Sequence, residues 1–178
     1  MAHGGAQSLV RLVGVLLVLA LVAGAATGLW LLRPVPSYSS DDVTAGSPFD
    51  VTFRVENKDD WFPLANLKVS CVLAHVRAEP IAPTLIGATN VRLPATDIRG
   101  LEPGESGTFT CPFLSFLEHQ VKDDPGVATR AEIYFRSAYD VPFLGSLLGS
   151  LQLTDNSARY FLDTRVLPPR WVVKPPQR

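Results

Sequence analysis

The feature that most constrains this chain is an uncharged, apolar run of 21 residues, Leu12 to Leu32, bracketed by Arg11 and Arg33. A helix rises about 1.5 Å per residue, so a helical run of this length extends about 30 Å. That length matches the hydrocarbon core of a bilayer, and no other part of the chain resembles it. The run therefore predicts a membrane-spanning segment at 12–32, preceded by a short cytoplasmic N-terminus at 1–11.

The run has two interpretations, which differ in whether the mature protein stays attached to the membrane. As a cleavable signal peptide, its apolar core is Leu12 to Val22, and the small residues Ala23 to Ala25 fit the cleavage pattern. As a signal anchor, the whole run is retained. We favour the anchor because apolar residues resume at Leu29 to Leu32, with Trp30 placed for the water interface. Cleavage instead releases a secreted soluble binder.

The two cysteines, Cys71 and Cys111, indicate on which side of the membrane the rest of the chain lies. Arg11 and Arg33 flank the run symmetrically and do not set its orientation. An even pair of cysteines among apolar neighbours fits an oxidising compartment, so we expect a Cys71–Cys111 disulfide in an extracytoplasmic, periplasmic domain. Such a bond stabilises a fold by about 3 to 4 kcal/mol in the chain-entropy model. Two free core thiols in a cytosolic domain are the alternative.

Composition bounds what the segment after Arg33 can bind. From Pro34 onward it holds 14 basic and 17 acidic residues, and 14 minus 17 is a formal charge of −3. A general nucleic-acid binder needs a basic face, so the charge balance argues against that class. The segment is 145 residues long, which is enough for one domain with its own core.

Alternating apolar and polar residues predict the fold of that domain. Phe49, Val51, Phe53 and Val55 alternate with polar residues, which gives a strand one buried and one wet face. Similar patterns, separated by turn residues, predict strands at about Leu67–Val76, Thr89–Leu93 at a sheet edge, Thr108–Phe113, Thr129–Ala138 and Ala158–Leu167. Many short strands with little helical periodicity predict an all-β fold, an antiparallel β-sandwich over residues 48–167. Residues 33–47 are expected to form a linker and 168–178 a Pro-rich basic tail.

Two segments carry a resemblance to a known family. The first predicted strand ends in Asn57 and is followed after a short turn by Asn66-Leu67-Lys68-Val69, while Leu101 to Glu105 forms an L-x-P-G-E turn before a later strand. Over Gly46 to Phe113 the chain thus resembles bacterial immunoglobulin-like envelope modules of the CARDB type. The resemblance implies an immunoglobulin-like sandwich in an extracytoplasmic setting. It implies no activity, because such sandwiches host many unrelated functions.

A charge-free segment, Val141 to Leu153, is the strongest candidate for a contact with a partner or with the membrane. Its large apolar residues, several of them at helical spacing, are Phe143, Leu144, Leu147, Leu148 and Leu151. The alternative is that this segment covers an open end of the sandwich. Trp171 in the basic tail is a further candidate contact, or it lies on the domain and fixes the tail there.

Motifs that carry catalysis or cofactor binding are missing from the sequence. It has no nucleophile elbow, phosphate-binding loop, dinucleotide fingerprint or zinc-protease motif, so we assign no catalytic residue, cofactor or metal ligand. Cys71 and His75 lie about 13 Å apart along a strand and cannot share one ion. A calcium site at Asn57, Asp59 and Asp60 stays an open alternative.

The sequence as a whole predicts a membrane-anchored module of the bacterial inner membrane with an extracytoplasmic domain. We expect it to act in interaction or assembly, without catalysis, with another envelope protein as partner. The alternative is an envelope metallochaperone or redox helper that uses Cys111. Membrane-anchored copper-delivery proteins resemble this layout, but they carry paired cysteines where this chain has only Cys111-Pro112-Phe113.

Overall fold

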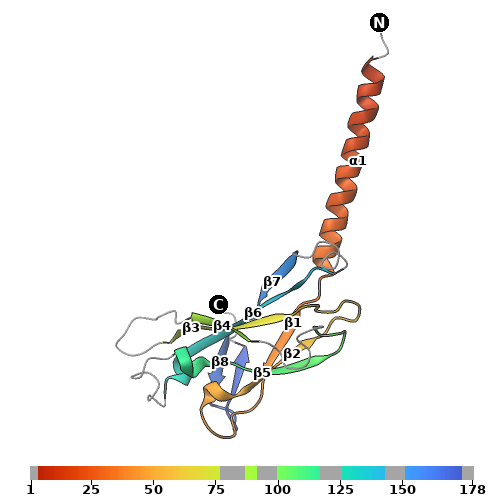
Figure 1. Cartoon of the computed structure of the whole chain (residues 1–178). Coiled ribbons are helices and arrows are strands. Elements are labelled where there is room, and N and C mark those ends of the chain that lie inside the picture. The colour runs from red at the N-terminus through yellow and green to blue at the C-terminus, as the bar shows by residue number, and fades with distance from the viewer. Residues whose placement is uncertain (1–3, 77–86, 92–99, 117–125, 143–150, 174–178) are drawn as a thin grey trace. The chain divides into compact units, whose positions relative to one another are not determined.

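The computed structural model describes residues 4–76, 87–91, 100–116, 126–142 and 151–173, and it divides the chain into two compact units, Met1–Arg33 and Pro34–Arg178. The first unit contains helix α1, Gly4–Leu31, shown in red in Figure 1. Its segment Arg11–Gly28 has a mean hydropathy of 2.0, and none of its residues is buried. Within the described residues this is the one helix long and apolar enough to cross a membrane, and a signal sequence has the same properties.

The second unit consists of antiparallel strands in two sheets (Figure 1). The smaller sheet has the order β1-β2-β5, with bounds Pro36–Ser40, Thr52–Asn57 and Ser106–Thr110. The larger has the order β4-β3-β6-β8-β9, with bounds Gly87–Val91, Lys68–Val76, Ala131–Asp140, Tyr160–Asp163 and Arg170–Val173, and β7 (Gln152–Asn156) also pairs with β6. Short 3-10 turns lie at Pro48–Asp50, Phe113–Phe116 and Ala128–Arg130.

The alternation in the sequence accounts for most of these strands. Phe53 and Val55 are fully buried in β2, while Arg54 between them is exposed. Along β3 the same pattern buries Val69 and Cys71 against the other sheet. The predicted strand at 89–93 exists as β4 and lies at the edge of the larger sheet, as expected. The prediction of an antiparallel, sandwich-like β-domain is therefore confirmed.

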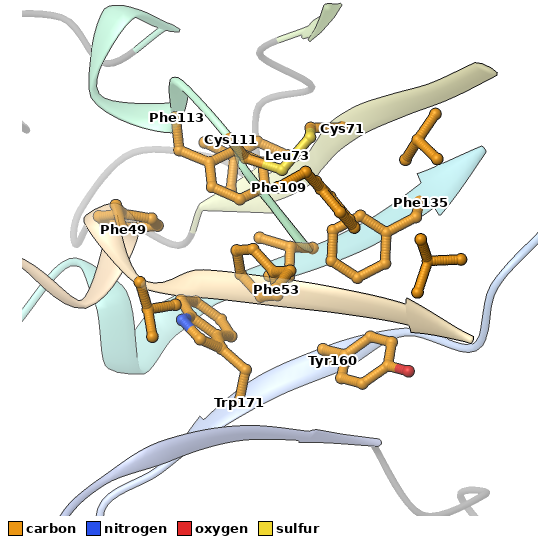
Figure 2. Packing of buried hydrophobic residues seen from close by; sticks show 14 of the residues in the cluster. Phe49, Phe53, Cys71, Leu73, Phe109, Cys111, Phe113, Phe135, Tyr160 and Trp171 are labelled. Carbon is orange, nitrogen blue, oxygen red and sulfur yellow. A yellow bond between two sulfur atoms is a disulfide. The ribbon is translucent and has the colours of Figure 1, made fainter. Parts of the chain in front are cut away.

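The core between the sheets is built from aromatic rings, as Figure 2 shows. Phe53 and Phe109 come from the smaller sheet and Phe135 from the larger. Their ring centroids lie 5.0 Å (Phe53 to Phe135) and 5.4 Å (Phe109 to Phe135) apart, with interplanar angles of 62° and 88°. Such edge-on contacts are worth about 0.5 to 1.5 kcal/mol each beyond the area they bury. The aromatic cluster therefore holds the two sheets face to face.

Two segments predicted to lie outside the sandwich are part of it. Strand β1 falls inside the expected linker at 33–47, and it pairs with β2 over its whole length. Strand β9 falls inside the expected tail and pairs with β8. The Ser40 hydroxyl accepts from Trp171 N at 3.0 Å and donates to Trp171 O at 3.2 Å, so the two segments also meet each other. The sequence prediction was wrong here because β1 is rich in Ser, and β9 is a strand of four residues in a segment that holds four prolines.

Candidate functional site

The predicted disulfide between Cys71 and Cys111 is present and joins the two sheets (Figure 2). Cys71 lies on β3 of the larger sheet, and Cys111 directly follows β5 of the smaller one. Their Cα atoms are 5.9 Å apart, and the residues are only 0% and 2% exposed. A metal-binding or redox role for Cys111 would need the bond to open and the sulfur to reach solvent.

Most of the predicted contact segment lies outside the described residues, namely Phe143, Leu144, Leu147 and Leu148. Its last residue, Leu151, is described and is 45% exposed. Val141 N donates to the Leu151 carbonyl at 3.2 Å, which closes the connection between β6 and β7.

Trp171 is a core residue, which corrects its assignment as a contact for a partner or the membrane. It is 2% exposed, and its ring centroid lies 5.7 Å from that of Phe49. Its indole Nε1 donates to the Pro48 carbonyl at 2.8 Å. The alternative reading, in which Trp171 fixes the end of the chain to the domain, is the one the structure shows.

A second candidate site is organised around Asn57, the last residue of β2, which is fully buried. Its side-chain Nδ2 donates to the carbonyls of Phe62 at 2.9 Å and Leu101 at 3.1 Å. Its backbone N donates to the Glu105 carbonyl at 2.9 Å, and its own carbonyl accepts from Gly104 N at 2.9 Å. One asparagine therefore binds both the β2–β3 loop and the turn that precedes β5. The family resemblance rests on the strand that Asn57 ends, on Asn66–Val69 and on this turn.

The β2–β3 loop is held in shape by two side chains. Asn57 Oδ1 accepts from Asp59 N at 3.1 Å, and Asp59 Oδ1 accepts from Trp61 N at 2.8 Å and Phe62 N at 2.7 Å. Such side-chain to backbone bonds replace the pairing that a loop cannot obtain from a sheet. The loop thereby presents Trp61, which is 81% exposed, in a defined position.

Gly100 allows the turn Leu101–Glu105 to lie close against the same loop. Leu64 and Leu101 form a two-way backbone bridge, at 2.9 and 3.2 Å. Gly100 has φ +86°, and a Cβ at this position would lie 1.8 Å from the Leu64 carbonyl oxygen. Only glycine fits such a close approach in this conformation. The turn and the Trp61 loop are thus joined by backbone contacts as well as by Asn57.

The surface around Trp61 is acidic. The two joined segments, Glu56–Pro63 and Gly100–Ser106, hold five carboxylates and one lysine, a formal charge of −4. Lys58 lies 3.7 Å from Glu56, and both side chains are well exposed. An exposed pair of this kind contributes little to stability and leaves most of the negative charge uncompensated. We call Trp61 with these carboxylates the Trp61 surface.

At the alternative calcium site, Asn57, Asp59 and Asp60, two of the side-chain oxygens already have hydrogen-bond donors. Asn57 Oδ1 and Asp59 Oδ1 already accept hydrogen bonds from loop backbone N–H groups. Over the described ranges, no three His, Cys, Asp or Glu side chains are grouped so that they could hold a metal ion. In this structure these side chains shape the loop.

A small cavity of about 280 Å³ lies between the start of β1 and the strands β7 to β9. Two phenols line it, and the Tyr160 hydroxyl donates to the Tyr38 carbonyl at 2.7 Å. Burial raises the pKa of Tyr160 to about 12 and raises the pKa of Tyr38 well above its ordinary value. Both phenols therefore stay neutral at physiological pH, and the Tyr160 hydroxyl serves as a hydrogen-bond donor.

The sequence analysis did not single out Trp61. The signal that could have found it is a large aromatic residue among turn residues, in the connection between two predicted strands. Alternation patterns do not detect it, because they report which residues a sheet buries.

A scan against protein-family models and a search of curated proteins both found no match to the chain.

Proposed function

We propose that this protein is a single-pass, membrane-anchored module of the bacterial inner membrane that acts in interaction or assembly and has no chemistry of its own. Helix α1 is the anchor, and the β-domain lies on the periplasmic side. The domain is an immunoglobulin-like envelope module of the CARDB type.

The observation that carries this proposal is the uncovered apolar surface of α1. No residue of Arg11–Gly28 is buried, and apolar side chains such as Leu21 are as much as 73% exposed. An apolar helix whose side chains are not buried within a protein is stable inside a bilayer, which buries them instead. The disulfide supports the periplasmic assignment, because such bonds persist in oxidising compartments.

The domain supports a role in binding. Its interior is filled by packed side chains, and its exposed features include the hydrogen-bonded loop that carries Trp61. Immunoglobulin-like domains commonly use loops at the ends of their strands to bind partners. The bonds between Asn57 and the Leu101–Glu105 turn support the family assignment, since they join the two segments that resemble the family.

The charge-free segment Val141–Leu153 remains our proposed contact with the membrane or with an envelope partner. Replacing Leu147 and Leu148 by Ser is expected to lower recovery with the membrane or partner, while the thermal transition of the domain stays unchanged. A collapse of that transition would show that the leucines cover the sandwich.

The anchor is tested by protein chemistry on membranes. The full chain should resist extraction by alkaline carbonate, keep its original N-terminus, and be degraded by protease only when the outer face of spheroplasts is accessible. A mature N-terminus at Ala26 would show that the run is a signal peptide and would leave a secreted binder. Two thiols that react with maleimide without reductant would remove the disulfide and favour the redox helper.

A further inference from the structure

We propose that the Trp61 surface is the docking site for an arginine-rich segment of an envelope partner protein. This inference rests on the proposed function, since it names the kind of partner that an interaction module binds. The Trp61 side chain is 81% exposed, which makes it the most exposed aromatic residue among those the structure describes. Tryptophan in such a position loses apolar hydration on binding and is among the residues most enriched in binding hot spots.

The loop that carries Trp61 is held by hydrogen bonds in the absence of a partner. Asp59 bonds the backbone N–H groups of Trp61 and Phe62, and Asn57 bonds the Phe62 carbonyl from beneath. A preorganised loop avoids the entropy cost of ordering on association. These bonds stabilise the loop through backbone groups, and none of them requires a large apolar side chain at position 61, which stays in solvent. Recognition explains this arrangement.

The charge around the ring selects the partner. The carboxylates of Asp60, Glu102 and Glu105 are exposed, and Asn57 binds the backbone of both segments that carry them. An arginine guanidinium stacks on an indole face by cation–π attraction and pairs with carboxylates through its N–H groups. An exposed tryptophan on a loop that is joined to an acidic turn thus matches arginine in both respects. An anionic lipid surface is repelled by the same charges.

The Trp61 loop lies at the end of the domain where its chain begins, because Asn57 pairs with Pro36, the first residue of β1. The partner segment therefore docks at that end of the domain.

The test measures binding of a fluorescein-labelled hexa-arginine peptide to the full chain in neutral detergent, by anisotropy at two salt concentrations. Trp61→Ala is expected to weaken binding at least tenfold, and the double variant Glu102→Gln and Glu105→Gln at least fivefold. Trp61→Phe, which keeps a ring, should retain more binding than Trp61→Ala. Hexa-lysine should bind more weakly than hexa-arginine, because it cannot pair in the bidentate manner.

The matched control is the double variant Asp41→Asn and Asp42→Asn. It removes the same charge from another acidic part of the domain. Asp41 and Asp42 follow β1 at the end where Ser40 pairs with Phe53, which is the opposite end of the β1–β2 pairing from Asn57. It should change hexa-arginine binding by less than twofold. Equal losses in the two double variants, or no loss in Trp61→Ala, would show non-specific attraction and overturn the proposal.

A second measurement separates the partner from the bilayer. The Trp30→Phe variant is reconstituted in vesicles of phosphatidylcholine brominated on its acyl chains, which quench nearby indoles. Trp61 fluorescence should stay unquenched, and strong quenching that is lost in Trp61→Phe would place Trp61 in the bilayer and refute docking of a cationic segment. If the chain stays in the membrane but does not bind the peptide, this inference is refuted and the anchor is not. If the chain is cleaved after Ala25 and still binds the peptide, the anchor is refuted and this inference is not.

Discussion

Replacing Asn57 with aspartate tests whether one buried amide holds the Trp61 loop and the Leu101–Glu105 turn together. The two side chains have nearly the same shape, so the change alters only hydrogen bonding and charge. Aspartate has no donor for the carbonyls of Phe62 and Leu101, which now bond Nδ2 at 2.9 and 3.1 Å. Two lost bonds cost about 1 kcal/mol each, and the unsatisfied carbonyls and the buried carboxylate raise the total to about 4 kcal/mol.

The loss of stability in Asn57→Asp should depend on pH. Burial raises the pKa of the introduced carboxyl above its unfolded value of about 4. The folded state then binds the proton more tightly than the unfolded state does, so the variant loses stability as pH rises through the raised pKa. At low pH the protonated carboxyl donates to one of the two carbonyls. The difference from wild type should therefore be larger at pH 7 than at pH 4.

The assay is urea unfolding of the full chain in neutral detergent, followed by the emission of the buried Trp171. With an m-value of about 2 kcal/mol/M, a loss of 4 kcal/mol lowers the midpoint by about 2 M. Asn156→Asp is the matched control, because Asn156 is exposed and should change stability by less than about 0.5 kcal/mol. If Asn57→Asp unfolds within that margin of wild type at pH 7, Asn57 does not hold these segments together.

Three further predictions follow from the core and its connections. Replacing both Cys71 and Cys111 with Ser should lower the unfolding free energy by about 4 kcal/mol, measured by urea midpoint, and a reductant should then have no further effect on the variant. Gly100→Ala should destabilise by about 2 kcal/mol or more because its Cβ clashes with backbone, and Gly104→Ala, at a similar φ of +76° in open space, should cost less. Tyr160 has a folded pKa of about 12, above its unfolded value of about 10, so its contribution is present below pH 10 and lost as pH rises toward 12. Tyr160→Phe should therefore show a shallower fall of thermal midpoint between pH 10 and 12, and an unchanged slope would contradict the assignment.

The parts of the fold that could be predicted from sequence are those where burial alone sets the pattern. Strand β2 alternates clearly because one face of it meets the aromatic core, and the cysteines could be placed facing each other because both lie between apolar neighbours. Strands β1 and β9 could not be predicted in this way. Strand β1 is largely polar, and β9 has only four residues after a pair of prolines. The place of both strands in the sheets depends on partners far away in sequence, such as Ser40 with Trp171.

At the candidate site, too, local patterns could be predicted from the sequence and long-range contacts could not. The turn chemistry of Asn57 and of Leu101–Glu105 is visible in the sequence, but that the two segments bind each other is not, because 44 residues separate Asn57 from Leu101. Trp61 was missed because exposure is decided by the loop's own hydrogen bonds, and these appear only once the backbone is folded.

The contacts of Trp171 have a consequence for how this protein is made. The indole closes the core against Phe49 and Pro48, and its backbone bonds Ser40, which lies 131 residues earlier in the chain. The first strand of the domain therefore lacks part of its support until β9 has been synthesised. The two sheets cannot close one strand at a time in the order of synthesis, because the first strand of the domain waits for one of the latest.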